Sequence, residues 1–200
     1  MKSLTPRQAL LLSLAAALST IVMKTGAWWL TGSIGYLSDA LESVVNVAGA
    51  GFALWMVSYA QRPADEAHQY GHGKAEYLSA AIEGALIFVA AGAIVWTSVG
   101  RLFDPVPLDQ PGVGLALSAI ATAINLVVGS ILVRAGRRAR SIAVEADGRH
   151  LLTDVVTSVG VLIGIGLVAI FEWYVLDPIV ALIVAANILF TGYHLLDRSV

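Results

Sequence analysis

The sequence predicts an all-α membrane protein with six transmembrane helices. Of its 200 residues, 58% are hydrophobic and 13% are charged, and the mean hydropathy is +0.78. Soluble domains carry about 25% charged residues, so this composition favours a membrane protein. A transmembrane helix needs about 20 mostly apolar residues. Stretches that meet this requirement are 7–30, 35–60, 77–100, 112–133, 141–171 and 178–196.

Local signals support the bounds of the individual predicted spans. The first span follows two basic residues and resembles a secretory signal peptide, but five further spans favour a retained helix. Polar or proline-rich connections separate most of the others. Pro63 and the polar run to Lys74 follow the second span, Asp104, Pro105, Pro107 and Pro111 follow the third, and Asp177 with Pro178 separates the fifth from the sixth.

The distribution of basic residues predicts the orientation. Connections on the cytoplasmic side carry an excess of Lys and Arg. Lys2 and Arg7 precede span one, Arg62 and Lys74 follow span two, Arg134, Arg137, Arg138 and Arg140 follow span four, and Arg198 follows span six. The opposite side has essentially Arg101. We therefore expect both termini in the cytoplasm, with Trp28, Trp29, Trp96, Trp173 and Tyr174 at the outer helix ends.

Composition also excludes several classes of function. The net charge of −2 provides no basic field for nucleic acid. Because the chain has no cysteine, a metal site has to use carboxylate, imidazole and amide groups. A membrane hydrolase is disfavoured, since neither GxSxG nor HExxH occurs. We expect no enzymatic activity and no prosthetic group.

Two pairs of polar residues lie within the second and fifth spans. Glu42 and Asn46 are four residues apart, as are His150 and Asp154, and this spacing places each pair on one helical face. If the two faces oppose one another, they offer an imidazole nitrogen, two carboxylates and an amide oxygen to a four-coordinate divalent cation. The alternative is that these groups only hydrogen-bond helices together, which is common in membrane bundles.

Further polar residues have alternative interpretations. Asp39 either assists the exit of an ion or bonds to Ser43 or a helix end. Glu83 either enters a polar pathway or is a protonated carboxyl that bonds to a neighbouring helix. Asp65, His68 and His72 in the loop before span three either bind a second cation or belong to an unremarkable loop.

Three segments of the chain resemble the cation diffusion facilitator family of divalent-metal transporters. They are TGSIGYLSDALESVVNV (31–47), RPADEAHQYGHGKAEYLSA (62–80) and VEADGRHLLTDVVTSVGVL (144–162), in the order found in the family. The resemblance covers nearly the whole chain. It implies six membrane helices, cytoplasmic termini, a homodimer, and exchange of a cytoplasmic divalent cation for protons by alternating access.

The resemblance also implies residue roles. Glu42 and Asn46 take the positions of the family's first ligand pair, and His150 and Asp154 take those of its HxxxD pair. The loop residues Asp65, His68 and His72 match the family's second metal site. We expect a multi-pass protein of the bacterial inner membrane that transports zinc, with a metal-binding sensor or partner-binding module as the alternative.

The sequence departs from the family pattern in two places. The common first pair is DxxxD or HxxxD, whereas this chain has Glu42 and Asn46. One anionic charge fewer leaves cadmium, iron or manganese as alternatives to zinc. The family usually carries a cytosolic metal-binding domain after the sixth span, and we expect none within residues 1–200. We therefore expect one six-helix transport domain over residues 1–200.

Overall fold

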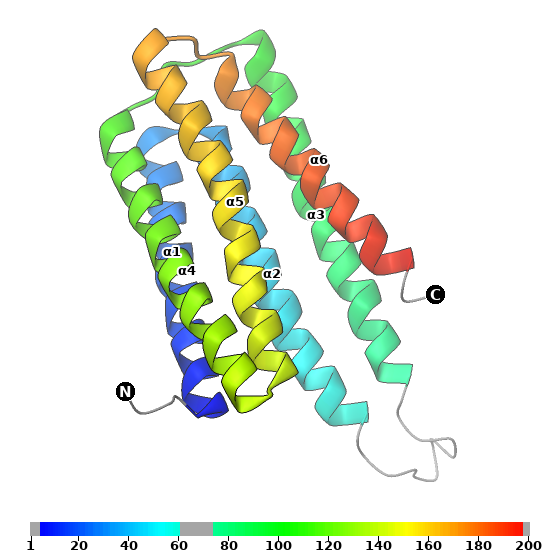
Figure 1. Ribbon diagram of the computed structural model, residues 1–200. Coiled ribbons are helices and arrows are strands. Elements are labelled where there is room, and N and C mark those ends of the chain that lie inside the picture. Colours follow the sequence, from blue (N-terminus) through cyan, green and yellow to red (C-terminus); the bar gives the residue numbers. More distant parts are fainter. Residues whose placement is uncertain (1–4, 61–73, 198–200) are drawn as a thin grey trace.

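The computed structural model describes residues 5–60 and 74–197, which form antiparallel helices (Figure 1). They are α1 (Pro6–Thr31), α2 (Ile34–Ala60), α3 (Lys74–Phe103), α4 (Pro111–Ala139), α5 (Ile142–Phe171) and α6 (Leu176–Asp197). No strand occurs in these two ranges. Each predicted span coincides with one helix, which confirms the all-α prediction.

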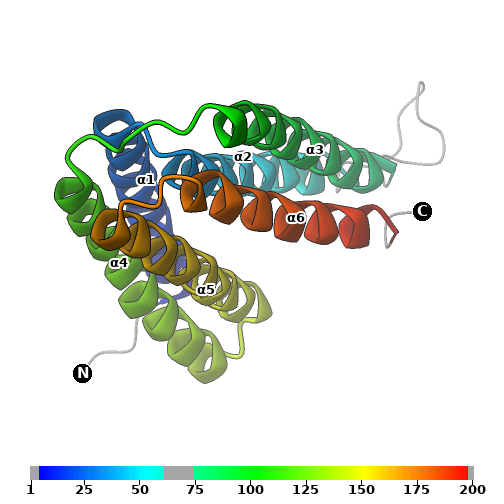
Figure 2. The ribbon, with the colours of Figure 1, turned by 90° about the horizontal axis from the view of Figure 1, so that it is seen from above.

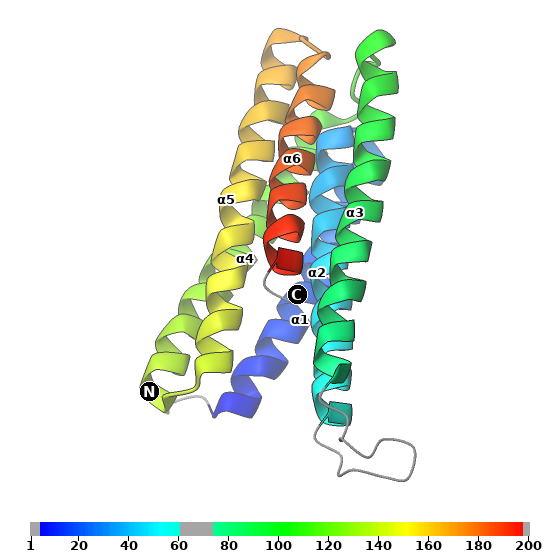
Figure 3. The same ribbon diagram turned by 90° about the vertical axis from the view of Figure 1, so that its right-hand side faces the viewer.

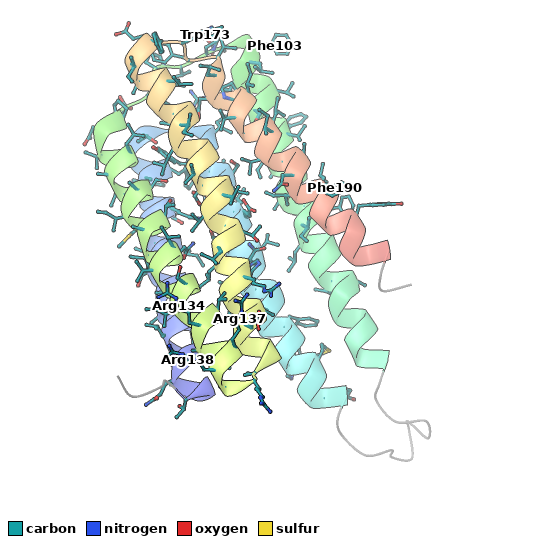
Figure 4. The ribbon with its side chains drawn as sticks, viewed as in Figure 1. Phe103, Arg134, Arg137, Arg138, Trp173 and Phe190 are labelled. Carbon is teal, nitrogen blue, oxygen red and sulfur yellow. The ribbon has the colours of Figure 1, made fainter. Side chains whose placement is uncertain are left out.

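The outer surface of the bundle is apolar. Within the described ranges, the helices long and apolar enough to cross a membrane are Gln8–Thr31, Gly84–Phe103, Pro111–Ala139 and Val144–Phe171, and α6 contributes a shorter apolar stretch, Leu176–Phe190. Phe103, Trp173 and Phe190 project outward from the helices (Figure 4). So large an exposed apolar surface is typical of a protein that faces lipid.

The arginine cluster lies on a helix, and its prediction as a loop is wrong. α4 continues from the predicted end at residue 133 to Ala139, because Arg and Ala are strong helix formers and basic residues stabilise a helix C-terminus. Arg140 ends α4 in the left-handed region with φ 50°, and the Ser141 side chain then caps α5.

The bundle has two distinct ends. Arg134, Arg137 and Arg138 lie at one, and Trp173 and Phe103 lie at the other (Figure 4). We name them the arginine-rich end and the aromatic end. Seen from above, α1, α4 and α5 form one group, while α3 and α6 pack beside α2 (Figure 2). The α4–α5 and α2–α3 pairs diverge toward the arginine-rich end (Figure 3).

Glycine allows α4 and α5 to approach closely. A Cβ atom on Gly148 of α5 would lie 2.6 Å from the Val133 amide nitrogen and 2.9 Å from the Gly129 carbonyl oxygen, both on α4. A side chain at that position would force the helices apart. This contact therefore sets the position of the polar residues that follow Gly148 on α5.

At the aromatic end, Asp177 of α6 caps the N-terminus of α2. Its carboxylate accepts hydrogen bonds from the Ser33 hydroxyl at 2.7 Å and from the Ile34 and Gly35 amides at 2.9 Å each. A carboxylate at a helix N-terminus satisfies amides that have no partner within the helix. Arg101 of α3 donates to the Gly32 carbonyl oxygen at 2.9 Å. These bonds tie four helices together at this end.

Candidate functional site

The predicted faces of α2 and α5 meet in the middle of the bundle. The Asn46 amide nitrogen donates to Oδ1 of Asp154 at 3.4 Å, and Asp154 is buried. His150 lies one turn from Asp154 toward the arginine-rich end. Glu42 lies one turn from Asn46 toward the aromatic end. In the structure, both polar pairs therefore lie along the contact between these two helices.

A cavity of about 70 Å³ lies at this contact. Helices α1, α2, α4 and α5 all contribute to its walls. The lining residues are Ser13, Ala17, Thr20, Ile21, Ser43, Asn46, Val47, Ala50, Asn125, Asp147, His150, Leu151 and Asp154. One water occupies roughly 30 Å³ in the liquid, so the cavity has room for a cation with part of its hydration shell.

The predicted ligands occupy adjoining turns and do not surround one point. In the described part of the chain, no three His, Asp or Glu side chains lie where they could hold one metal ion. His150 is exposed at the cavity wall. Glu42 is half-buried and outside the described lining, and its Oε2 accepts no hydrogen bond from the described residues. A site formed by all four side chains therefore requires a movement of Glu42 and His150, or of the helices that carry them, toward Asn46 and Asp154.

Asp147 and Asn125 are among the cavity residues that were not predicted as part of the site. Asp147 lies one turn before His150 on α5, between it and the arginine-rich end. Asn125 of α4 is buried, and its Oδ1 accepts no hydrogen bond within the described ranges. The i, i+3 spacing of Asp147 and His150 was the available signal, since such residues share a helical face.

A buried ion pair lies beside the cavity. The Lys24 ammonium of α1 donates to Asp39 Oδ1 at 2.8 Å and to the Ser43 hydroxyl at 2.9 Å. The Ser158 hydroxyl of α5 donates to the same Asp39 oxygen at 2.9 Å. Ser43 also donates to the Asp39 backbone carbonyl, which fits one predicted role of Asp39. The sequence already held a sign of the Lys24–Asp39 pair, because Lys24 is the single lysine inside the first span and an ionisable residue there needs a partner.

Some predicted residues fall outside the described part of the chain. Asp65, His68 and His72 belong to residues 61–73, which the structure does not describe. The second loop site therefore stays a prediction. Glu83 belongs to α3, and its side chain lies outside those described.

The fold and this site define a class: a multi-helix integral membrane protein with a polar, carboxylate-containing cavity enclosed by apolar helices. Residues 10–200 match the model of the cation efflux transmembrane domain. Since the match covers almost the entire chain, the protein belongs to this family.

Named relatives agree with the family match. The chain is 53% identical over 189 residues to an uncharacterized transporter, sll1263, from Synechocystis sp., a match that covers 94% of this chain and 61% of the relative. It is 34% identical over 200 residues to the cation-efflux pumps FieF of Salmonella arizonae and Salmonella typhi, covering 96% of this chain and 66% of each pump. The chain thus spans slightly less than two thirds of these relatives.

Proposed function

We propose that this chain is the membrane transport unit of a divalent metal cation efflux protein that exchanges the metal for protons by alternating access. The observation that carries the proposal is the contact of Asn46 with Asp154 in a cavity that His150 also lines. Family membership and the cation-efflux pumps among the relatives support it. The metal is cargo in this proposal, with zinc ranked before cadmium, iron and manganese.

In the proposed mechanism, the cation enters the cavity and binds Glu42, Asn46, His150 and Asp154. The metal needs a neutral imidazole and ionised carboxylates, so it competes with protons for the same atoms. This competition couples cation release to proton uptake. Asn46 has no proton to exchange at its oxygen and serves to coordinate the cation or orient Asp154.

The proposed orientation places the arginine-rich end in the cytoplasm. Basic residues are concentrated on the cytoplasmic side of membrane proteins, and Arg134, Arg137 and Arg138 lie together at this end of α4 (Figure 4). Bacterial relatives support the bacterial inner membrane as the location. The proposed assembly is a homodimer.

Flux into proteoliposomes tests the proposal. Zinc, cadmium, iron and manganese are compared under an imposed proton gradient, with metal and proton movement recorded together. Asp154→Asn removes one anionic ligand at nearly constant volume. The matched control is Glu172→Gln, because Glu172 is exposed at the aromatic end, away from the cavity.

We expect the parent chain and Glu172→Gln to move metal against protons. We expect Asp154→Asn to lose at least about 100-fold in flux, since even outer-shell partners of metal ligands contribute about 10–100-fold. Metal binding without flux by the parent chain would contradict transport and favour a sensor or partner-binding module. Equal flux by Asp154→Asn and the control would contradict the site.

A further inference from the structure

The cavity lining follows three parallel stripes. On α1 the lining residues are Ile21, Thr20, Ala17 and Ser13, on α2 they are Ser43, Asn46, Val47 and Ala50, and on α5 they are Asp154, Leu151, His150 and Asp147. From Thr20 to Ser13, from Ser43 to Ala50 and from Asp154 to Asp147, each stripe covers seven residue steps, or about 10 Å at 1.5 Å per residue. All three extend from the middle of the bundle toward the arginine-rich end. The cavity therefore extends along the bundle from its middle toward the arginine-rich end. Its inner end lies at the level of Thr20, Ser43 and Asp154.

The next turn of each stripe carries one member of the buried ion-pair cluster. Lys24 follows Thr20 on α1, Asp39 precedes Ser43 on α2, and Ser158 follows Asp154 on α5, each four residues away. Lys24 and Asp39 are each 1% exposed, and Ser158 is fully buried. The cluster thus joins the three helices on the aromatic side of the cavity.

The charge of this cluster opposes the passage of a cation. Lys24 is the one basic side chain buried within the described ranges. Its ammonium donates to Oδ1 of Asp39 and to the hydroxyl of Ser43, a cavity-lining residue, so a positive charge lies at the inner end of the cavity and repels a divalent cation. Beyond it, the bonds of Asp177 and Arg101 hold the helix ends together.

Asp39 also has an unused oxygen. Its Oδ2 is buried and accepts no hydrogen bond within the described part of the chain. Oε2 of Glu42, one turn away on α2, is also buried and accepts no hydrogen bond there. Two such carboxylate oxygens in succession along one helical face form a path for a cation from the cavity toward the aromatic end.

We propose that Lys24, Asp39 and Ser158 form the outer gate of the transport pathway, and that Asp39 is the contact for the outgoing cation once the ammonium has left it. The inference rests on the proposed function, which supplies the outward direction of transport. Opening the aromatic side separates α1 and α5 from α2. This movement breaks the bonds of Asp39 to Lys24 and Ser158, and its carboxylate becomes available to the cation leaving Glu42.

Thiol accessibility tests the gate without relying on transport. The chain has no cysteine, so Ala17→Cys places a single reporter on the cavity wall. Vesicles of both orientations are treated with a small membrane-impermeant methanethiosulfonate. The parent reporter is compared with the same reporter carrying Lys24→Met, with Lys24→Met/Asp39→Leu, and with Arg138→Met as the control for loss of an exposed basic residue.

We expect the rate of thiol modification from the aromatic side to rise at least tenfold in Lys24→Met. In Lys24→Met/Asp39→Leu this rate should return to near the parent rate, because an apolar pair closes the gate again. Arg138→Met should match the parent. If Lys24→Met is not monodisperse, Asp39→Asn replaces it with the same expected rise. A rate within twofold of the parent, with the reporter still reactive from the arginine-rich side, would overturn the gate.

Metal flux measured on the same vesicles separates the two proposals. Absence of flux in the parent chain would refute transport and leave the labelling result intact. Flux in the parent chain with unchanged labelling in Lys24→Met would refute the gate alone.

Discussion

The helices that surround the cavity differ from the α3–α6 pair in what they bury. Helices α1, α2, α4 and α5 bury Lys24, Asp39, Asn125 and Asp154 in the membrane interior. In the described parts of α3 and α6, the buried polar residues are Ser98 and Asp177, toward the aromatic end. The remaining contact is apolar, formed by Ile87, Ala90, Ile94, Ala181, Val184, Ala185 and Ile188.

This difference distinguishes residues that only pack the helices together from charged residues that have another role. An ionisable side chain costs at least about 3 kcal/mol at the centre of a membrane, whereas apolar and small residues suffice to pack helices. Within its described side chains, the α3–α6 pair packs with buried charge only at Asp177, near the aromatic end. In the proposed function, the charges around the cavity mark the part of the bundle where cations and protons are exchanged.

Breaking the buried ion pair should lower the stability of the bundle more than any other single change considered. Lys24→Met leaves the Asp39 carboxylate without its counter-charge, and we expect a loss of about 3–5 kcal/mol in the free energy of unfolding. Lys24→Met/Asp39→Leu should recover most of it, because apolar pairs of similar volume replace buried ion pairs at little cost. Unfolding in detergent measures both. A double variant no more stable than the single one would show that charge is not the cause.

The second prediction concerns the apolar half. Ile94 of α3 is fully buried in the apolar cluster that α3 and α6 share, and Ile94→Ala should destabilise the bundle by about 2–3 kcal/mol through the cavity it leaves. Val89→Ala is the control, since Val89 is 72% exposed on the lipid face of the same helix. Metal affinity, measured by titration calorimetry, should stay the same in both. A weakened metal affinity in Ile94→Ala would show that the packing of α3 against its neighbours also affects metal binding.

The third prediction uses two glycines of α5. Gly148→Ala puts a methyl group against the α4 backbone and should cost about 2 kcal/mol, within the range for overpacking. A Cβ atom on Gly160 meets nothing within 4 Å. Gly160→Ala should therefore leave stability unchanged or raise it by about 0.5 kcal/mol. Equal melting temperatures in detergent for the two variants would show that α4 and α5 do not need this close contact.

The smallest expected effect concerns metal preference. Asn46→Asp adds a carboxylate to α2 beside Asp154, and we expect zinc affinity to rise roughly tenfold, or about 1.4 kcal/mol. Without metal, the two carboxylates repel, so the variant should unfold at a lower temperature. Titration calorimetry with zinc, iron and manganese measures the affinity. An unchanged affinity for all three would remove Asn46 from the site.

Much of the fold was predictable because apolar runs and proline-rich connections are strong local signals. The span predicted over 35–60 is α2 (Ile34–Ala60), and that over 141–171 is α5 (Ile142–Phe171). The end of α4 was not predictable from hydropathy, because helical structure continues past the apolar region where Arg137 and Arg138 favour it.

The candidate site was predictable only in part. The i, i+4 spacing indicates that Asn46 and Asp154 lie on polar faces, and the structure brings these faces together. Spacing within a helix does not reveal which other helices surround it, so the contributions of α1 and α4 to the cavity were missed. Lys24 was missed for the same reason, since its partners lie on α2 and α5.

In the proposed function, one cation binds between α2 and α5, beside Asp154. The most direct measurement is the anomalous diffraction of zinc in crystals of the parent chain and of Asp154→Asn. We predict a peak at the cavity, in contact with Asp154 and His150, that disappears in the variant. A zinc peak confined to the segment 61–73 or to the protein surface would contradict a cation site beside Asp154.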